Sequence, residues 1–330
     1  MAGAPAPSGK TGGVGRGAFA WLLMVATAGC GGTPGTAIVA LAFSSDGRWL
    51  AVAQADGCVS AVELAATTRR QLRVGGSDPH IALTEDGSRL AVAAEGSVTV
   101  WSLALGRRER QLGAGLGQNL SLKLSDAPEP FLLAGFDSAG GGDNLKIWRL
   151  SDNVLIGSLA GSPRATFTFA DEAVLLLSEA DRAYQVASFS GRILRQAMFP
   201  QPLGRTAFAA DGAFLAGVIG AGTDQERIAI MSVADDAFVW QSTEPNRGTR
   251  QLLFLENPSR VVQLGDRVIV YDHADGKALT ALPALTTARL AVASPDGGAI
   301  AAVGGNGTVV MVSSEDGRER PVDWGGGCGP

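Results

Sequence analysis

The feature that most constrains the fold of this chain is a short hairpin pattern that recurs seven times. Each copy has an apolar stretch, a turn rich in small or acidic residues and a second apolar stretch, as in AFSSDGRWLAVA over residues 42–53. An Asp-Gly turn between two apolar runs is a strong signal of a β-hairpin. The turn position returns every 40 to 45 residues, at Asp46, Asp86, Asp126, Asp171, Asp211, Glu256 and Asp296. The sequence therefore predicts seven repeats of one β unit.

The length of the repeat predicts one architecture, because four-stranded propeller blades recur at about 40 to 45 residues. A hydrophobic fraction of 46%, a charged fraction of 18% and 45 glycines also favour many short strands and turns over long surface helices. In the first repeat we expect strands over residues 38–43, 49–54, 59–64 and 70–74. The fold class is therefore all-β, a seven-bladed β-propeller of four-stranded antiparallel blades over residues 37–324, followed by a Gly-rich tail at 325–330.

Two motifs carry a resemblance to a known family. The hairpins SSDG, TEDG, AADG and SPDG resemble the WD-repeat signature, and the third strands end in pairs similar to its terminal Trp-Asp. These pairs are Trp101-Ser102, Trp148-Arg149 and Tyr271-Asp272. The resemblance covers nearly all of the chain after residue 30, although no repeat has the Gly-His pair that usually opens the motif. It implies a degenerate WD-repeat-like propeller.

The N-terminal residues have the pattern of an export signal. Lys10 and Arg16 are the only charged residues in the first 17, and an apolar run follows over residues 18–28. This run is too short to span a bilayer, which needs about 20 residues, but it is typical of a signal-peptide core. We therefore expect export.

The end of this run, Thr27-Ala28-Gly29-Cys30, resembles the lipobox of bacterial lipoproteins, in which the cysteine is acylated. The resemblance implies a signal peptide at 1–29 that is cleaved before Cys30, lipidation of Cys30 and a short linker at 30–36. Because Gly31 rather than Asp follows the cysteine, it implies an outer-membrane location. The alternative is an ordinary thiol beside a plain cleavage site or an uncleaved anchor.

Net charge argues against one class of partner. The whole chain has a formal charge of −5, and the chain after residue 29 has −7, because two basic residues and no acidic ones are lost. Nucleic-acid binding calls for a basic face. We expect no nucleic-acid partner and a monomeric propeller.

Closure of the ring is predicted from the last repeat. Residues 318–324 are able to supply the fourth strand of the seventh blade, so closure would rest on packing between the first and last blades. Cys58 lies in the turn between the second and third strands of the first blade, and Cys328 follows the last strand. An oxidising compartment permits a disulfide between them. The flexible residues 325–327 leave a free Cys328 as the alternative.

The sequence contains no recognisable catalytic constellation. His80 and His273 are the only histidines, they fall in different blades, and we expect both to be structural. No group of His, Cys and carboxylate residues has metal-ligand spacing, so we expect neither a metal nor a cofactor.

Acidic residues fall in or beside the turns between the second and third strands of six blades, with Asn306 in the seventh. They are Asp56, Glu95, Asp143, Asp181, Asp224 and Asp266. Asp favours turns through local hydrogen bonds to the backbone, so a structural role in the turns explains these residues without a ligand. Since all these turns open on one face, a ring of carboxylates for a cation or a basic peptide is the functional alternative.

Three functions follow. The leading hypothesis is a non-enzymatic scaffold for protein–protein interaction, anchored by lipid in the bacterial cell envelope, whose protein partner the sequence does not identify. The second is a lactonase-like or quinoprotein-like enzyme with its site at the axial channel. The third is a lipoprotein resembling the propeller component of outer-membrane barrel assembly, although that relative has more blades.

Overall fold

The computed structural model describes residues 37–328, apart from 67, 85, 115, 126–129, 138–143, 161–165, 171–172, 179–182, 200, 244, 246 and 257–258. These residues belong to one compact unit, Pro34–Pro330. The expected signal peptide at 1–29, Cys30 and the linker at 30–36 lie outside the described residues. Within the described ranges, no helix has the length and apolar character that spanning a bilayer requires.

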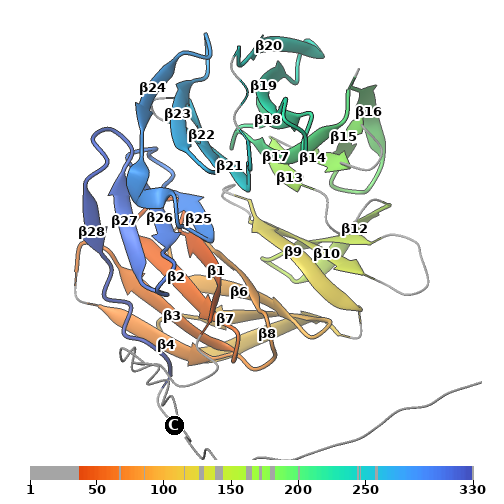
Figure 1. Ribbon diagram of the computed structural model, residues 1–330. Helices are drawn as coiled ribbons and strands as arrows, with labels where there is room; N and C mark the ends of the chain where they lie inside the picture. The colour runs from red at the N-terminus through yellow and green to blue at the C-terminus, as the bar shows by residue number, and fades with distance from the viewer. Residues whose placement is uncertain are drawn as a thin grey trace, which may run out of the picture. The chain divides into compact units, whose positions relative to one another are not determined.

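The described chain forms seven four-stranded antiparallel sheets around a common axis (Figure 1). Blades 1 and 2 contain β1 (Ile38–Phe43), β2 (Trp49–Gln54), β3 (Cys58–Glu63), β4 (Arg69–Arg73), β5 (His80–Leu83), β6 (Arg89–Ala94), β7 (Ser97–Ser102) and β8 (Arg107–Gly113). Blades 3 and 4 contain β9 (Gln118–Leu124), β10 (Phe131–Asp137), β11 (Leu145–Arg149), β12 (Val154–Leu159), β13 (Thr166–Ala170), β14 (Ala173–Ser178), β15 (Ala183–Ser188) and β16 (Ile193–Met198).

Blades 5 and 6 contain β17 (Leu203–Phe208), β18 (Phe214–Ile219), β19 (Arg227–Ser232), β20 (Ala237–Gln241), β21 (Gln251–Leu255), β22 (Arg260–Leu264), β23 (Val268–Asp272) and β24 (Ala278–Ala281). Blade 7 contains β25 (Leu290–Ala293), β26 (Ala299–Val303), β27 (Val309–Ser313) and β28 (Glu319–Pro321). A 3-10 turn, η1 (Pro283–Leu285), joins blades 6 and 7. The predicted seven-bladed propeller is confirmed, and the four strands of blade 1 begin and end within one residue of their expected positions.

Each blade is built from consecutive strands, and its first strand lies nearest the axis. The first strands of neighbouring blades contact one another around the ring, as β1 does with β5 and with β25. The fourth strands are therefore at the outer edge. In blades 1, 2 and 7 these outer strands carry exposed arginines, which discourage pairing with another sheet edge.

The Asp-Gly hairpins owe their shape to local hydrogen bonds. In the last hairpin the Ser294 hydroxyl donates to the Asp296 carboxylate at 2.5 Å, and the same carboxylate accepts the N–H of Gly298 at 3.0 Å. These bonds, the Ser294 side chain first, hold the pKa of Asp296 below its ordinary value. Gly297 follows at a φ of +69°, which glycine adopts without the penalty that a Cβ brings.

Packing between blades supplies the core. In the second strand of blade 1, Ala51 and Ala53 are fully buried and belong to a cluster with Ile81 and Leu83 of the next blade. Small side chains in the second strand let neighbouring sheets approach closely. Each sheet therefore buries its apolar faces against the sheets of the neighbouring blades. This nearest-neighbour packing is what stabilises a repeat protein.

Blade 7 keeps its own fourth strand, as expected, because β28 pairs with β27. Closure of the ring then depends on the contact between blades 7 and 1. Leu41 and Val52 of blade 1 are in one buried cluster with Ala301 and Met311 of blade 7. Among the described strands, none of blade 1 pairs with a strand of blade 7.

A disulfide joins Cys58 to Cys328 beside the seam, with the two Cα atoms 5.6 Å apart and a sequence separation of 270. Side chains of β4 hold the same tail, since the Gln71 amide donates to the Gly326 carbonyl at 3.3 Å and Arg73 donates to the Cys328 carbonyl at 3.3 Å. Residues 325–328 are thus attached to blade 1.

We expect the double variant Cys58→Ser, Cys328→Ser to unfold at lower urea concentration than the oxidised wild type. A crosslink across so long a loop restricts the unfolded chain and stabilises the fold by on the order of 4 kcal/mol. Tryptophan fluorescence during urea unfolding measures the difference. Dithiothreitol should destabilise the wild type and leave the double variant unchanged. Equal stability of the oxidised and reduced wild type would contradict the prediction.

Candidate functional site

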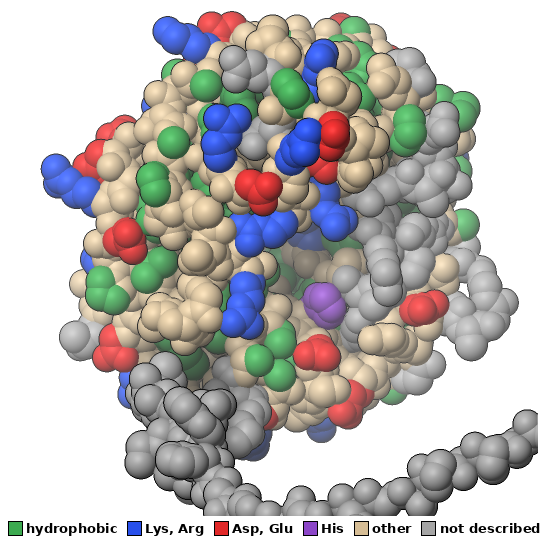
Figure 2. Space-filling model, viewed as in Figure 1, with side chains coloured by type: hydrophobic (Ala, Val, Ile, Leu, Met, Phe, Trp, Pro, Cys, Tyr) green, Lys and Arg blue, Asp and Glu red, His purple; other side chains and the backbone are tan. Residues whose placement is uncertain are grey.

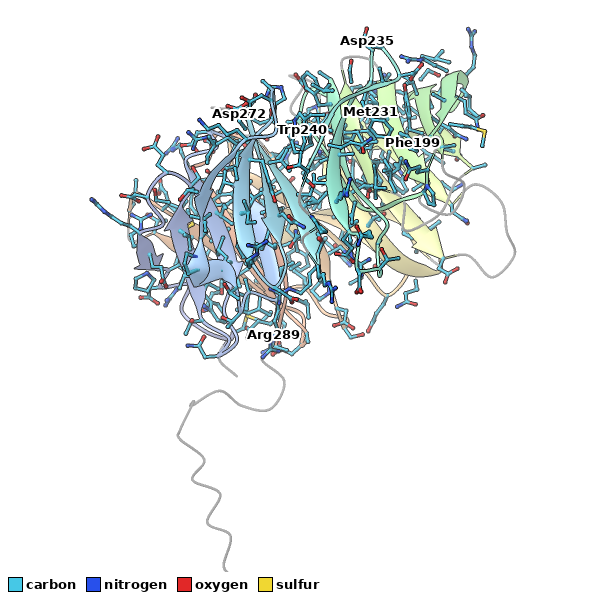
Figure 3. All side chains as sticks on the ribbon, turned by 45° about the horizontal axis from the view of Figure 1, so that its top comes forward. Phe199, Met231, Asp235, Trp240, Asp272 and Arg289 are labelled. Atoms are coloured by element: carbon cyan, nitrogen blue, oxygen red, sulfur yellow. A yellow bond between two sulfur atoms is a disulfide. The ribbon has the colours of Figure 1, made fainter. Side chains whose placement is uncertain are left out.

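The two ends of the propeller differ in the segments that they display. One end carries the hairpin turns between first and second strands, such as residues 44–48 and 294–298, and we call it the hairpin face. The other end carries the turns between second and third strands, such as 55–57 and 265–267, and we call it the turn face. Figure 3 shows Asp235 and Asp272 at the hairpin face and Arg289 at the opposite end.

Four of the six predicted acidic residues lie exposed on the turn face, namely Asp56, Glu95, Asp224 and Asp266. Asp143 and Asp181 lie outside the described residues. The Asp56 carboxylate accepts the N–H of Cys58 at 3.0 Å, as turn chemistry predicts, and Asp224 forms an ion pair with Arg247 at 3.1 Å. The described carboxylates thus share a face but do not converge on a common point.

The axial channel widens into a cavity of about 530 Å³ at the hairpin face. First strands and hairpins of six blades line it, with Phe43, Phe208 and Phe254 among the larger apolar side chains. The half-buried Lys123 and Glu256 supply its charge. The described wall of the cavity therefore combines apolar side chains and polar groups with one cationic and one anionic side chain.

Hydrogen bonds run across four blades beside this cavity. The Lys123 ammonium donates to the Thr168 hydroxyl at 2.8 Å, and that hydroxyl lies 3.5 Å from the Ala210 carbonyl, to which it donates. The Ala210 N–H donates to the Glu256 carboxylate at 2.6 Å. These bonds fix both charged groups to the framework of the ring and account for their presence without a ligand.

The two histidines lie at opposite ends of the molecule. His80 begins β5 on the turn face, where burial lowers the pKa of its imidazole against the opposing effect of Asp78. His273 follows β23 at the hairpin face, and its ring packs edge-on against Phe214 at 4.7 Å. In the described part of the chain, no three His, Cys, Asp or Glu residues are placed to hold a metal ion.

One group of side chains was not singled out from the sequence. Arg205, Arg250 and Arg289 lie at or beside the first residues of the first strands of blades 5, 6 and 7. Since first strands surround the axis, these arginines lie near the turn-face end of the channel. Figure 2 shows Lys, Arg and His side chains around a hollow in the middle of this face. The available signal was a basic residue at or near the start of the first strand in consecutive repeats.

Comparison with known proteins gives the fold. No family model and no curated protein matches the chain. Hydrazine synthase of Kuenenia stuttgartiensis is similar in structure, with a TM-score of 0.67 and 13% identity over 87% of this chain and 98% of that one. The Cps50 (Swd1) β-propeller domain of Myceliophteria thermophila has a TM-score of 0.66 and 14% identity over 84% of this chain and 96% of that one. The likeness is one of fold.

Glu226 fixes a loop of the turn face. Its side chain is only 6% exposed, and its carboxylate accepts the N–H of Gly222 at 2.7 Å and that of Thr249 at 3.0 Å. Burial alone raises the pKa of the carboxyl, but the N–H groups of Thr249 and Gly222 outweigh it, so that the pKa lies below its ordinary value. The residue ties the loop after β18 to the segment that enters β21.

We expect Glu226→Ala to destabilise the protein by about 3 kcal/mol, because two N–H donors lose their buried acceptor. Urea unfolding at pH 7 measures this, and Glu226→Gln, which keeps one acceptor, should lose less. Since the folded-state pKa is lowered, the contribution of the charge is full well above the unfolded value of about 4.3 and is lost as the pH falls through the folded-state value. A Glu226→Ala variant as stable as the wild type would contradict the assignment.

Proposed function

We propose that this chain is a non-enzymatic, WD-repeat-like propeller that binds another protein of the bacterial envelope through its turn face. The observation that carries the proposal is the display of four exposed carboxylates on the turns of that face. Turns between paired strands hold these charges at fixed positions. A basic surface on the partner is the complementary chemistry, because opposite potentials speed encounter and set orientation.

The N-terminal sequence supports attachment to a membrane. In this proposal residues 1–29 are removed and Cys30 carries the acyl chains, each buried methylene of which contributes about 0.8 kcal/mol to membrane binding. Six residues lie between Cys30 and Ala37, where the described chain begins. The propeller would then work close to the membrane, in reach of other envelope proteins.

We expect the turn face, and not the hairpin face, to crosslink to the partner. The test variant is Asp56→Asn, Glu95→Gln, Asp224→Asn, Asp266→Asn, in which each amide keeps an acceptor oxygen for the turn. The matched control removes four exposed carboxylates from the hairpin face, as Asp211→Asn, Asp235→Asn, Asp275→Asn, Glu315→Gln.

Crosslinking and mass spectrometry on intact cells should find the same partner peptides for the wild type and the control. In the turn-face variant, we expect their yield to fall about tenfold, since several rim charges at about 0.2 to 1 kcal/mol each act together. Equal yields from both variants, or crosslinks that map to the hairpin face, would count against the proposal.

Lipidation has its own test. Cells fed an alkyne fatty acid should label the wild type and shorten it by residues 1–29. A Cys30→Ser variant should neither be labelled nor be cut before position 30, whereas Cys58→Ser should behave as the wild type. An unlabelled wild type that is recovered without residues 1–29 would refute the anchor and leave the propeller assignment unaffected.

A further inference from the structure

The turn face carries a group of cations that lies nearer the axis than its exposed carboxylates. Arg205 lies in β17, Arg250 directly precedes β21 and Arg289 directly precedes β25, so three consecutive blades each place an arginine near the axis. All three side chains are exposed. His80 takes the corresponding position at the start of β5 in blade 2. We call Arg205, Arg250 and Arg289 the arginine group.

Two members of the group are held in place by carbonyl oxygens. Arg250 Nη2 donates to the carbonyl of Thr286 at 2.6 Å and to that of Gly265 at 3.2 Å, and Arg289 Nη2 donates to that of Gly305 at 2.8 Å. A carbonyl oxygen orients a guanidinium but does not cancel its charge. Each guanidinium has five N–H donors, so others remain for a ligand.

The charges of the group are not neutralised within the described ranges. The ion pairs found there join other arginines to carboxylates, among them Arg247 to Asp224 on the same face. The group therefore forms a positive region that is preset by backbone contacts. Arginine in this state suits planar or tetrahedral oxyanions, which accept two N–H bonds from one guanidinium.

The backbone at Arg205 is a second, independent observation. Gly204 pairs with Val218 and Thr206 with Gly217, so that Arg205 is an extra residue in β17. Its φ is +46°, a left-handed value that is uncommon and unfavourable for a residue with a side chain. Such bulges redirect side chains and occur often beside functional sites. Strand β1 also shifts register near its start, between Ile38 and Ala40, whereas Arg205 combines such a shift with a positive φ and a charged side chain.

The outer carboxylates limit the size of the ligand. An extended polyanion that covered the face would meet Asp56, Glu95 and Asp266 at its margin and be repelled. A compact anion would meet fewer of these carboxylates than an extended one. Three cations favour a group with two negative charges over a single carboxylate.

We propose that the arginine group binds a phosphate monoester at the turn-face end of the axial channel. The phosphate belongs either to a small soluble molecule or to the headgroup of a lipid. This site is independent of protein binding by the outer carboxylates, and it stands if that function fails.

The test uses two probes and the disulfide-bonded chain from residue 31 on, which contains the whole compact unit and lacks the Cys30 acyl chains that would carry it to any vesicle. Isothermal titration with glycerol 3-phosphate at low ionic strength detects a soluble ligand. Flotation with phosphatidylcholine vesicles, with and without phosphatidic acid, detects a lipid headgroup. The variants are Arg250→Gln, Arg289→Gln together and Arg205→Gln alone. The control, Arg107→Gln, Arg108→Gln, removes two exposed charges from β8 on the outer edge.

Saturable binding of either probe is expected. It should weaken about tenfold or more in Arg250→Gln, Arg289→Gln, because charge-assisted hydrogen bonds of about 1.5 to 3 kcal/mol are lost, and less than twofold in the control. Binding to vesicles alone would assign the phosphate to a lipid, and binding of glycerol 3-phosphate would assign it to a soluble ester.

Two results would overturn the proposal. One is the absence of saturable binding of both probes to the folded wild type. The other is equal weakening in the β8 control, which would reduce the effect to net charge. Urea unfolding checks that the variants are folded, and Arg205→Gln, which leaves both carbonyl-bound arginines intact, repeats the test if the double variant is unstable.

Discussion

The structure depends on the burial of sheet faces between neighbours. A four-stranded blade has two apolar faces and no means of covering either by itself, so its stability comes from the blades on both sides. Ala51 and Ala53 illustrate the constraint, because side chains of this size let the next sheet approach until Ile81 and Leu83 exclude water. Burial of apolar area contributes roughly 25 cal/mol per Å², and it is lost at both free faces if the ring opens. The turns, the outer strands and the disulfide all act on a ring that this packing holds together.

The hairpin turns set the register that this packing requires. Because side chains alternate along a strand, a slip of one residue would turn each apolar set toward the wrong side. The bonds from Thr84 and the N–H of Ser88 to the Asp86 carboxylate, both 2.9 Å long, fix where the second strand begins. Gly87 then lies so close to Trp49 of the preceding blade that a Cβ on it would come within 2.2 Å of the indole. The same turn thus serves register within a blade and contact between blades.

The fold was predictable from the sequence because these determinants are local and repeated. The functional face was less so. Asp56 and Asp266 stood out as turn residues, since the pattern that marks them lies within one repeat. Arg250 and Arg289 did not, because each looks like an ordinary charge before a strand until three blades are placed around an axis. Glu226 is similar: its acceptor role joins Gly222 to Thr249, and that pairing exists only after blades 5 and 6 pack. Properties that depend on several blades at once are therefore the part that a repeat pattern does not reveal.

The way in which blade 7 is completed has a consequence for the history of the chain. Since β25 to β28 come from one continuous segment, no blade in the described part of the chain borrows a strand from the other end. A duplication or deletion of about 40 residues would then add or remove one complete blade and leave the strand pairing of the other blades unchanged. Propellers closed by exchanged strands lack this freedom. Here the disulfide between Cys58 and Cys328, rather than shared strands, links the last blade to the first. The number of blades is therefore able to change through duplication or deletion of gene segments.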